Sequence, residues 1–548
     1  MVECTALEMQ HRCKSIGGSN LSLSRAGPVV ETIEQEPIMP KNIVVYSDGT
    51  GQDGGVRPEQ RVSNVYKMYR ASRTGPENPI DPNDQVAFYD AGLGTDIGAT
   101  ALTAPRRFIQ KLLGSVTGNG IVRNIADCYA FIINHYEPGD RVFLIGFSRG
   151  AYTVRSLANL LMLCGVPTQA PGGPLMRYRK QVDDIAMEAV TVVLEHGAGF
   201  PRAQYAAERE EQARRFREKY GSDGAVNSNV APYFIGVFDT VASLGAKGPR
   251  RLGIQAGLMA AFVFTVGLAA ALPMLLIAWL LDGRFSFWPA WWGLMLLTQV
   301  GAGWWWTRRQ KASRLKIIRD FPKPGDVREH YAEWKDDNFD RLLSVYAKFG
   351  RAANAIDENR KDFQRVEWGT VIGDPATSAE AEGPPKLVQM WFAGNHSDIG
   401  GSYPEAESRL SDNALSWMIE QATSVPDGLK LGPVYVNDVK VANTGDEGTP
   451  LHLFPRADGV QHCELAGMRD TIDGYVAQVP VWLPLVRGWF AKLNWPEEMR
   501  KVPHDARVDE SVRQRFKLDD VTQCAGHGKY RPEAMRHHDE FGTLYPPL

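Results

Sequence analysis

The stretch from Val142 to Ala151, VFLIGFSRGA, constrains the fold of this chain more than any other. Its apolar first half has the character of a buried strand, and the following AYTVRSLANLLMLCG has the periodicity of a helix. A strand and a helix joined by Gly-X-Ser-X-Gly predict a nucleophile elbow, a sharp turn that presents the hydroxyl of Ser148 above the sheet. Gly146 and Gly150 fit this geometry, because a Cβ at either position would meet the neighbouring strand or helix. The alternative is a tight turn with an incidental serine.

The chain around this motif alternates between strand-like and helix-like segments. Strand-like apolar runs lie at 42–47, 85–89, 231–244 and 386–393. Helical patterns lie at 65–70, 118–136, 175–219 and 326–363. This alternation predicts an α/β fold in which a mostly parallel sheet is flanked by helices.

Three residues with the chemistry of a serine hydrolase each follow a different strand-like run: Ser148, Asp239 and His396. Because parallel strands end at one edge of a sheet, we expect these side chains to converge there. Serine, aspartate and histidine in this order are typical of the α/β-hydrolase architecture. We expect His396 to take the proton of Ser148 as it attacks an ester, while Asp239 orients and stabilises the imidazolium.

The oxyanion of such a reaction needs hydrogen-bond donors close to the nucleophile. We expect them to be the backbone amide of Arg149 and amides of the turn Asp48-Gly49-Thr50-Gly51, which follows the first strand. The helix after Ser148 adds the positive end of its dipole. The carboxylate of Asp48 either organises this turn for catalysis or forms a structural Asx turn.

Two further aspartates compete with Asp239 for the acid position. Asp90 ends the second strand-like run, and Asp398 lies two residues after His396. Asp398 alternatively pins the loop of His396 through backbone amides. The sequence leaves these alternatives open.

Two long uncharged runs, residues 252–281 and 285–307, interrupt the α/β pattern. At about 1.5 Å per residue, each is long enough to cross a hydrocarbon core of about 30 Å. Tryptophans gather toward their ends, and basic residues precede and follow the pair, which places both outer ends in the cytoplasm. Residues 247–316 are therefore predicted to form a transmembrane hairpin inserted in the α/β domain. The alternative is an unusually apolar core hairpin.

The rest of the chain is divided by this insertion. We expect a flexible N-terminal segment at 1–40, a first part of the hydrolase core at 41–246, and a second part with a C-terminal cover at 317–548. The net charge of −3 argues against a nucleic-acid binder. Six scattered cysteines contain no Cys-X-X-Cys pair, so neither a disulfide framework nor a zinc site is expected, and a reducing compartment fits best. No cofactor and no metal are expected.

Five segments together resemble the DUF2235 family, which includes the Tle1-like phospholipase effectors of type VI secretion. These segments are SDGTG, YDAGLGTD, GFSRGAYTVRSLA, GVFDTVASLG and GNHSDIGGSY. The resemblance assigns the family's triad to Ser148, Asp239 and His396. It implies hydrolysis of lipid esters, with glycerophospholipids as the substrate class.

The apolar hairpin sets this chain apart from the secreted effectors, because it would make export through a secretion tube awkward. We expect instead a multi-pass membrane enzyme with a cytoplasmic catalytic domain, in the inner membrane of a bacterium, whose substrate is a bilayer lipid. The sequence does not identify a protein partner. The alternatives are another carboxylesterase or thioesterase of this fold, a phosphatase-like enzyme using Asp48, and a non-catalytic membrane scaffold.

Overall fold

The computed structural model describes most of the chain after residue 38. The described residues are 39–49, 61–92, 119–224, 227–241, 248–280, 286–334, 343, 346–369, 385–465, 476–477, 497–524 and 526–547. Nearly all of the expected flexible segment 1–40 therefore lies outside them, as do Thr50 and Gly51 of the expected oxyanion turn. Pro40 to Leu548 form one unit by their internal contacts.

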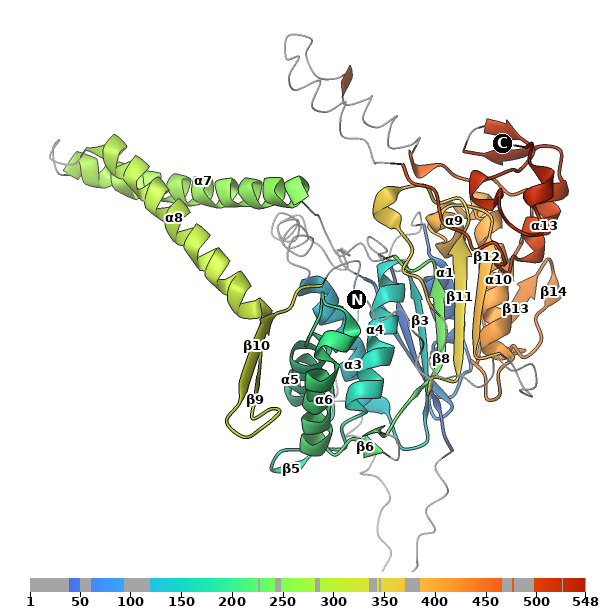
Figure 1. The fold of residues 1–548 in the computed structure, drawn as a ribbon, viewed down its shortest axis with the longest axis horizontal. Coiled ribbons are helices and arrows are strands. Elements are labelled where there is room, and N and C mark those ends of the chain that lie inside the picture. Colours follow the sequence, from blue (N-terminus) through green and yellow to red (C-terminus); the bar gives the residue numbers. More distant parts are fainter. Residues whose placement is uncertain are drawn as a thin grey trace, which may run out of the picture. The chain divides into compact units, whose positions relative to one another are not determined.

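A parallel sheet forms the centre of this unit (Figure 1). The described strands in it have the order β12-β11-β8-β3-β1-β2, and each neighbouring pair is parallel. They are β1 (Asn42–Ser47), β2 (Gln85–Asp90), β3 (Arg141–Phe147), β8 (Pro232–Phe238), β11 (Phe349–Ala355) and β12 (Leu387–Phe392). The predicted α/β fold with a mostly parallel sheet is confirmed.

Helices cover both faces of the sheet, and β1 shows why. All its residues are buried; Ile43 and Val45 contribute to the core on one face, and Val44 and Tyr46 to the core on the other. Side chains of a strand alternate between faces, so a strand covered on both sides needs a continuous apolar run. The helices on the Ile43 side are α3 (Asn119–His135), α4 (Arg149–Cys164), α5 (Lys180–Glu188) and α6 (Ala206–Tyr220), and those on the other side are α1 (Asn64–Ser72) and α10 (Arg409–Thr423).

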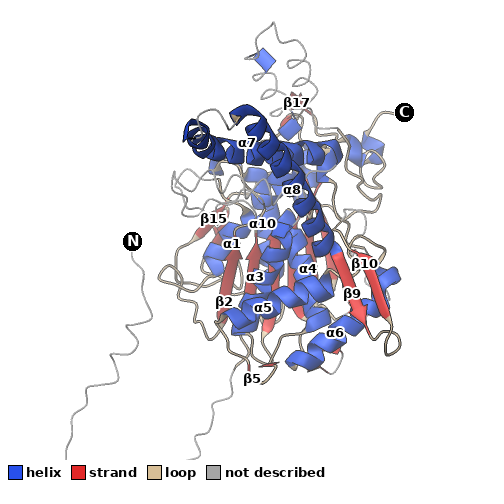
Figure 2. Cartoon of the chain, turned by 90° about the vertical axis from the view of Figure 1, so that its left-hand side faces the viewer, coloured by secondary structure: helices blue, strands red, loops and turns tan. Residues whose placement is uncertain are grey.

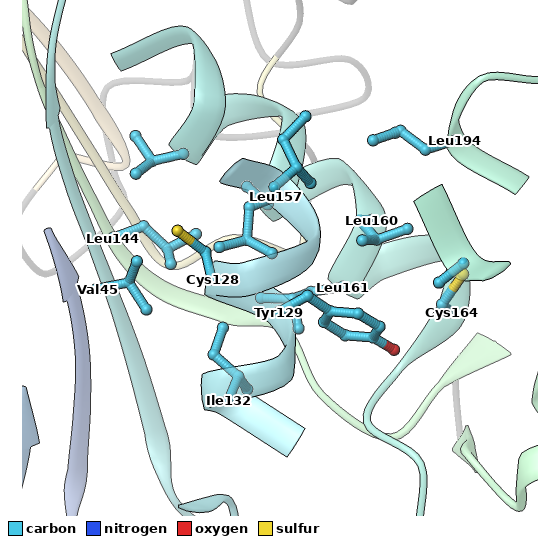
Figure 3. Close-up of a cluster of buried hydrophobic side chains, with 14 of the residues drawn as sticks. Val45, Cys128, Tyr129, Ile132, Leu144, Leu157, Leu160, Leu161, Cys164 and Leu194 are labelled. Carbon is cyan, nitrogen blue, oxygen red and sulfur yellow. The ribbon is translucent and has the colours of Figure 1, made fainter. Parts of the chain in front are cut away.

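The core between α3, α4 and the sheet is tightly packed with aliphatic side chains (Figure 3). Helices α3, α4 and α5 lie in front of the strands in Figure 2. Cys128 of α3 and Cys164 of α4 are buried free thiols within this layer. The hydroxyl of Tyr129 donates to the carbonyl of Gly165 at 2.6 Å, so the one polar atom of that side chain is satisfied.

The chain leaves the sheet after β8 and forms two long helices, α7 (Gly248–Leu280) and α8 (Phe287–Arg314). They contact each other: the indole N–H of Trp291 donates to the carbonyl of Gly267 at 3.0 Å. Many of their large apolar side chains are exposed, with Trp279 at 77% and Leu297 at 72%. Such contiguous apolar exposure is unusual for a protein surface in water.

The two predicted membrane spans are not equally supported. Among the described helices, one segment, Met259–Ile277 of α7, is long and apolar enough to cross a membrane. Helix α8 falls short of that measure, because its apolar run is rich in Trp and Gly and contains Gln299. The helices α7 and α8 occur where the hairpin is predicted, but the described residues do not support two membrane spans.

Smaller elements complete the described chain. The short strands are β4 (Gln169–Ala170), β5 (Gly173–Pro174), β6 (Asp223–Gly224), β7 (Asn227–Ser228), β9 (Leu315–Arg319), β10 (Val327–Tyr331), β13 (Val434–Val436), β14 (Val439–Lys440), β15 (Leu451–Leu453), β16 (Val521–Gln523) and β17 (Gly526–Gly528). The remaining helices are η2 (Ala189–Leu194), η3 (Arg202–Tyr205), η4 (Lys361–Phe363), α9 (His396–Gly400), η6 (Glu405–Glu407), α13 (Glu510–Lys517), η7 (Glu533–Met535) and η8 (Gly542–Leu544).

Two expectations from the sequence are wrong in this region. The segment 326–363, read as helical, contains the strands β10 and β11 instead. Cys463 and Cys524 are joined by a disulfide, whereas the scattered cysteines predict no disulfide framework. The C-terminal segment packs its own apolar cluster, which includes Val512 and Phe516 of α13, against Trp391 of β12.

Candidate active site

Ser148 lies in a strained turn between β3 and α4. Its φ of 58° and ψ of −121° are unusual for a residue with a side chain, and such strain is typical of functional turns. A Cβ at Gly146 would lie 2.6 Å from the carbonyl oxygen of Gly150, and one at Gly150 would overlap the carbonyl oxygen of Ser47. Both glycines of the motif are therefore required by close backbone packing. Ser148 itself is 8% exposed to solvent.

Asp239 and His396 form a buried pair at the same edge of the sheet. Asp239 directly follows β8, and His396 is the first residue of α9, shortly after β12. The Nδ1 of His396 lies 2.6 Å from Oδ2 of Asp239, and the other carboxylate oxygen accepts the amide N–H of Ala355 at 3.1 Å. The side chain of Asn395 caps α9 by accepting from two amides of its first turn. These contacts fix the position and tilt of the imidazole.

A third group, Arg500, also binds the carboxylate of Asp239. Its Nη2 donates to Oδ2 at 2.7 Å. Burial alone would raise the pKa of Asp239, but the guanidinium of Arg500 and the hydrogen bond from His396 outweigh it and lower that pKa to about 2. Asp239 is therefore a carboxylate at neutral pH, although it has no exposure to solvent.

No hydrogen bond joins Ser148 to His396, and the contact between the two parts of the site runs through Phe147. The ring of Phe147, the residue before Ser148, packs on the imidazole with centroids 4.7 Å apart. The Nε2 of His396 is buried and has no hydrogen-bond partner in the described part of the chain. This nitrogen is thus available to a proton donor. Such contacts are often long in enzymes without bound substrate.

Asp48 and Asp90 lie at the ends of β1 and β2 and serve local contacts. Asp48 accepts the amide of Gly49 at 2.7 Å, the hydroxyl of Tyr89 at 2.7 Å and the hydroxyl of Ser63. Burial raises the pKa of Asp48 to about 6, although these hydrogen bonds lower it. Burial also raises the pKa of Asp90, whose carboxylate accepts from Ser47 and Asn124. The structure does not bring Asp90 to His396.

Asp398 is bound to a different histidine, His462. Its Oδ1 lies 2.7 Å from Nδ1 of His462, and its Oδ2 accepts the amide of Asn395 at 3.0 Å. The carboxylate of Asp398 therefore holds the loop that carries His396 through a backbone amide. Burial lowers the pKa of His462, but the carboxylates of Asp398 and Glu407 outweigh it and raise that pKa.

Arg149 begins α4 beside the nucleophile, so its amide is one of the helix N-terminal donors. Burial lowers the pKa of its guanidinium to about 10. Gly49 also lies close to the nucleophile, because a Cβ on it would be 3.2 Å from the Cβ of Ser148. These two of the expected oxyanion residues are thus near Ser148, while Thr50 and Gly51 lie outside the described residues.

The sequence did not reveal Arg500 or the buried pair Glu358 and Arg360. Two charge-assisted hydrogen bonds of 2.7 Å join Arg360 to Glu358, whose Oε2 also accepts the amide of His396 at 3.2 Å. The signal available was the run Ile-Asp-Glu-Asn-Arg, in which opposite charges follow directly on an apolar segment. Arg500 had no such signal.

Proteins that match this chain include one curated relative and two solved structures. The uncharacterized protein YEL023C of Saccharomyces cerevisiae is 24% identical over an alignment of 477 residues, which covers 79% of this chain and 64% of that protein. An uncharacterized protein from Pseudomonas aeruginosa matches 69% of this chain and 45% of its own at 15% identity and a TM-score of 0.27. The Tle1 effector bound to the VgrG spike of the type 6 secretion system matches 71% of this chain and 57% of its own, at 14% identity and a TM-score of 0.23. These scores carry no argument about the fold, and the chain spans about half to two thirds of these proteins.

A family model covers more than half of the chain. The model for the catalytic domain of the Tle1-like phospholipase effectors of the type 6 secretion system matches residues 41–276 and 315–421. Its gap, 277–314, contains the end of α7 and all of α8, and the match resumes at the first residue of β9. Most of α7 therefore lies inside the matched region, and the predicted insertion at 247–316 stays a prediction. The chain belongs to the family of Tle1-like phospholipase effector catalytic domains.

Proposed function

We propose that this chain is a membrane-anchored serine hydrolase that cleaves carboxylic esters of lipids, with a phospholipase activity on bilayer lipids. One observation carries the proposal: a strained serine, a histidine and an ionised, buried aspartate follow three parallel strands at one edge of the sheet, and the last two are 2.6 Å apart. Membership in a phospholipase effector family supports the lipid ester as the substrate class.

In the proposed mechanism, the unpartnered Nε2 of His396 accepts the hydroxyl proton as Ser148 attacks the ester carbonyl. Asp239, held as an anion by Arg500, stabilises the imidazolium that forms. His396 then gives this proton to the departing alkoxide. In the second half, His396 takes a proton from water as the oxygen of that water attacks the acyl carbon, and it returns the proton to the oxygen of Ser148 as the fatty acid leaves.

The negative charge on the tetrahedral oxygen needs donors that are already in place. We assign this task to the backbone amide of Arg149 and to the turn that begins with Asp48 and Gly49. The three hydrogen bonds that Asp48 accepts would keep this turn in position, so its carboxylate has a structural task beside the reaction. Asp90 has no catalytic role in the proposed mechanism. Asp398 contributes only by holding the loop that carries His396.

The helices α7 and α8 are proposed to anchor the catalytic domain in a bilayer, as a two-span hairpin with both outer ends in the cytoplasm. The proposal rests on the exposed apolar side chains of both helices and on the basic end of α8, where Arg308 and Arg309 lie 5.0 Å from the rings of Trp304 and Trp305. Such Arg–Trp pairs suit a membrane–water boundary. A bacterial inner membrane is the proposed location, and no protein partner is assigned.

An active-site label tests the proposed chemistry. Detergent-solubilised protein is treated with a fluorophosphonate probe, which phosphonylates activated serines. We expect the wild type and Ser156→Ala, which alters another serine of α4, to be labelled, and Ser148→Ala to stay unlabelled. Labelling of Ser148→Ala, or none of the folded wild type, would exclude Ser148 as the nucleophile and favour a non-catalytic scaffold.

A panel of lipids in mixed micelles tests the substrate class. We expect release of fatty acid from glycerophospholipids, measured by mass spectrometry, and its loss in Ser148→Ala. Hydrolysis of short esters or thioesters without any action on phospholipids would instead favour the esterase or thioesterase alternative.

A further inference from the structure

A second cluster of chemically active side chains lies at the place where the helical insertion returns to the domain. His196 follows η2, Glu208 lies in the first turn of α6, and His330 lies on β10. They are 1%, 6% and 7% exposed, so each is almost fully buried. One ligand atom from each lies within 4.8 Å of the others. None of the three takes part in the mechanism proposed above.

The spacing of these atoms suits a metal ion. The Nε2 of His196 lies 3.0 Å from Oε2 of Glu208, and the rings of His196 and His330 meet edge to face with centroids 4.5 Å apart. Bonds of about 2.0–2.2 Å from a central zinc ion place its ligand atoms about 3–4 Å apart. The cluster therefore needs only a small contraction around His330 to enclose an ion.

The protonation of the three groups also suits a metal. Burial lowers the pKa of His330 to about 4, and it lowers the pKa of His196, so both imidazoles are neutral at pH 7. Burial would raise the pKa of Glu208, but hydrogen bonds from His196 and Arg328 outweigh it and lower that pKa. Metal ions bind neutral imidazole and ionised carboxylate, which are the forms present.

One ring nitrogen of the cluster has no hydrogen-bond partner among the described residues. The Nε2 of His330 accepts the amide of Gly197 at 2.9 Å, so the ring proton lies on Nδ1. That nitrogen is buried and has no partner among the described residues. A buried polar group without a partner is uncommon in a folded protein and often marks a site that awaits a ligand.

We propose that His196, Glu208 and His330 bind a divalent transition metal ion, with zinc as the best match to two imidazoles and one carboxylate. Each ring binds through one nitrogen and keeps its proton on the other, so no net proton is released. On His196 the proton moves from the nitrogen that faces Glu208 to Nδ1. On His330 the metal binds the unpartnered Nδ1, the ring proton moves from Nδ1 to Nε2, and the amide of Gly197 moves away from that nitrogen.

The position of the cluster defines the role of the metal. His196 and Glu208 precede the insertion in the chain, whereas His330 lies on the strand pair that follows α8. A metal shared by them would fasten the end of the insertion to the α5–α6 side of the domain. Its three protein ligands would leave a fourth position for water. This inference does not depend on the hydrolase activity, because its readout is metal binding and stability.

The test measures metal bound to the full chain in detergent, produced without a histidine tag. The protein is stripped with a chelator, incubated with zinc sulfate, desalted, and its metal content is determined by mass spectrometry. We expect about one zinc per chain and a higher melting temperature than in the stripped protein. A cobalt(II) sample should show the d–d absorption of nitrogen and oxygen ligation.

Three variants make the result specific. Glu208→Gln keeps the size of the side chain and can still contact His196, and it should lose most of the bound zinc, the thermal shift and the cobalt bands. His330→Gln provides the same test should Glu208→Gln fail to fold, as judged by circular dichroism. His527→Ala, which removes an exposed histidine, should bind zinc like the wild type. Wild-type protein without zinc, or a folded cluster variant with undiminished zinc, would overturn the proposal.

Discussion

Replacing Gly150 by alanine tests whether the Gly-X-Ser-X-Gly turn is held by the packing described above. Gly150 is the second residue of α4, where helix propensity alone favours alanine by about 1 kcal/mol. The added Cβ, however, would overlap the carbonyl oxygen of Ser47 and lie 2.7 Å from the amide nitrogen of Asp48. Both atoms belong to the main chain at the end of β1, so neither can rotate away. The sign of the effect therefore depends on whether the backbone yields.

The structure sets the size of the expected shift. Ordinary contact begins at about 3.4 Å, so α4 and β1 must separate by at least 0.7 Å at Asp48, and by more at Ser47. Overpacking of this kind costs about 1–3 kcal/mol, and the rigid neighbours favour the upper end, which exceeds the gain in propensity. We expect Gly150→Ala to lose about 2 kcal/mol of unfolding free energy. Since a misplacement of about 1 Å can cost roughly 100-fold in rate, kcat/KM should fall by about 10- to 100-fold.

The assays are urea unfolding and hydrolysis of a short-chain p-nitrophenyl ester by the same preparation. Gly173→Ala is the matched control, because a Cβ at Gly173 meets nothing within 4 Å; it should stay within about 0.5 kcal/mol of the wild type and keep its activity. If Gly150→Ala is as stable and as active as this control, the close packing of β1 against the start of α4 is wrong, and so is the argument for the elbow.

Three further perturbations give distinct readouts. Burial raises the pKa of Asp239, and Arg500 makes the largest contribution to lowering it to about 2, so Arg500→Gln should raise this pKa. A lowered carboxyl pKa adds stability above about pH 4, and this stability is lost as the pH falls toward 2. The midpoint of acid unfolding, measured by near-UV circular dichroism, should therefore rise by up to about one pH unit in Arg500→Gln. His462 has a raised pKa in the folded protein, which adds stability below about pH 6.5; this stability is lost as the pH rises through that pKa. In urea unfolding, His462→Gln should therefore have an unfolding free energy about 1 kcal/mol below that of the wild type at pH 6, and the difference should shrink by pH 9. A reporter fused at Gly283, between α7 and α8, should be non-cytoplasmic, whereas one at the C-terminus should be cytoplasmic.

Each of these results has a clear opposite. An acid midpoint that Arg500→Gln leaves unchanged would mean that the guanidinium does not control the charge of Asp239. A deficit for His462→Gln that is the same at pH 6 and pH 9 would remove its link to titration, and His527→Gln serves as the exposed control. A cytoplasmic reporter at Gly283 would exclude the hairpin topology.

The strands β1, β3 and β8 are readable because nearly all of their residues are buried and each carries an apolar run. β12 is readable from its apolar residues, although Gln389 interrupts them and half of the strand is only partly buried. β11 was not, because FGRAANA is rich in alanine and contains an arginine, which favour a helix when considered locally. It is a strand because β8 and β12 lie on either side of it and pair with its whole length. Tertiary pairing overrides a weak local preference here.

Some residues of the candidate site can likewise be predicted from the sequence, and others cannot. Ser148, Asp239 and His396 each follow a recognisable strand, so topology alone predicts that they share an edge of the sheet. Arg500 and His462 reach that edge from the C-terminal part, where the sequence has no clear periodicity and the contacts are decided by packing. The disulfide of Cys463 could not be predicted for the same reason, because spacing along the chain does not reveal which loops meet in space.

The pairing of β8 with β11 has a consequence for the order in which the molecule is made. Asp239 leaves the ribosome 157 residues before the histidine that it holds, and the whole of α7 and α8 is synthesised in between. Until the long helices have emerged, only β1, β2, β3 and β8 of the described strands can form the sheet, and β8 is its unpaired edge. A catalyst directed at lipids would thus be unable to act during its own synthesis, and it would acquire its chemistry only when the last strands close the sheet.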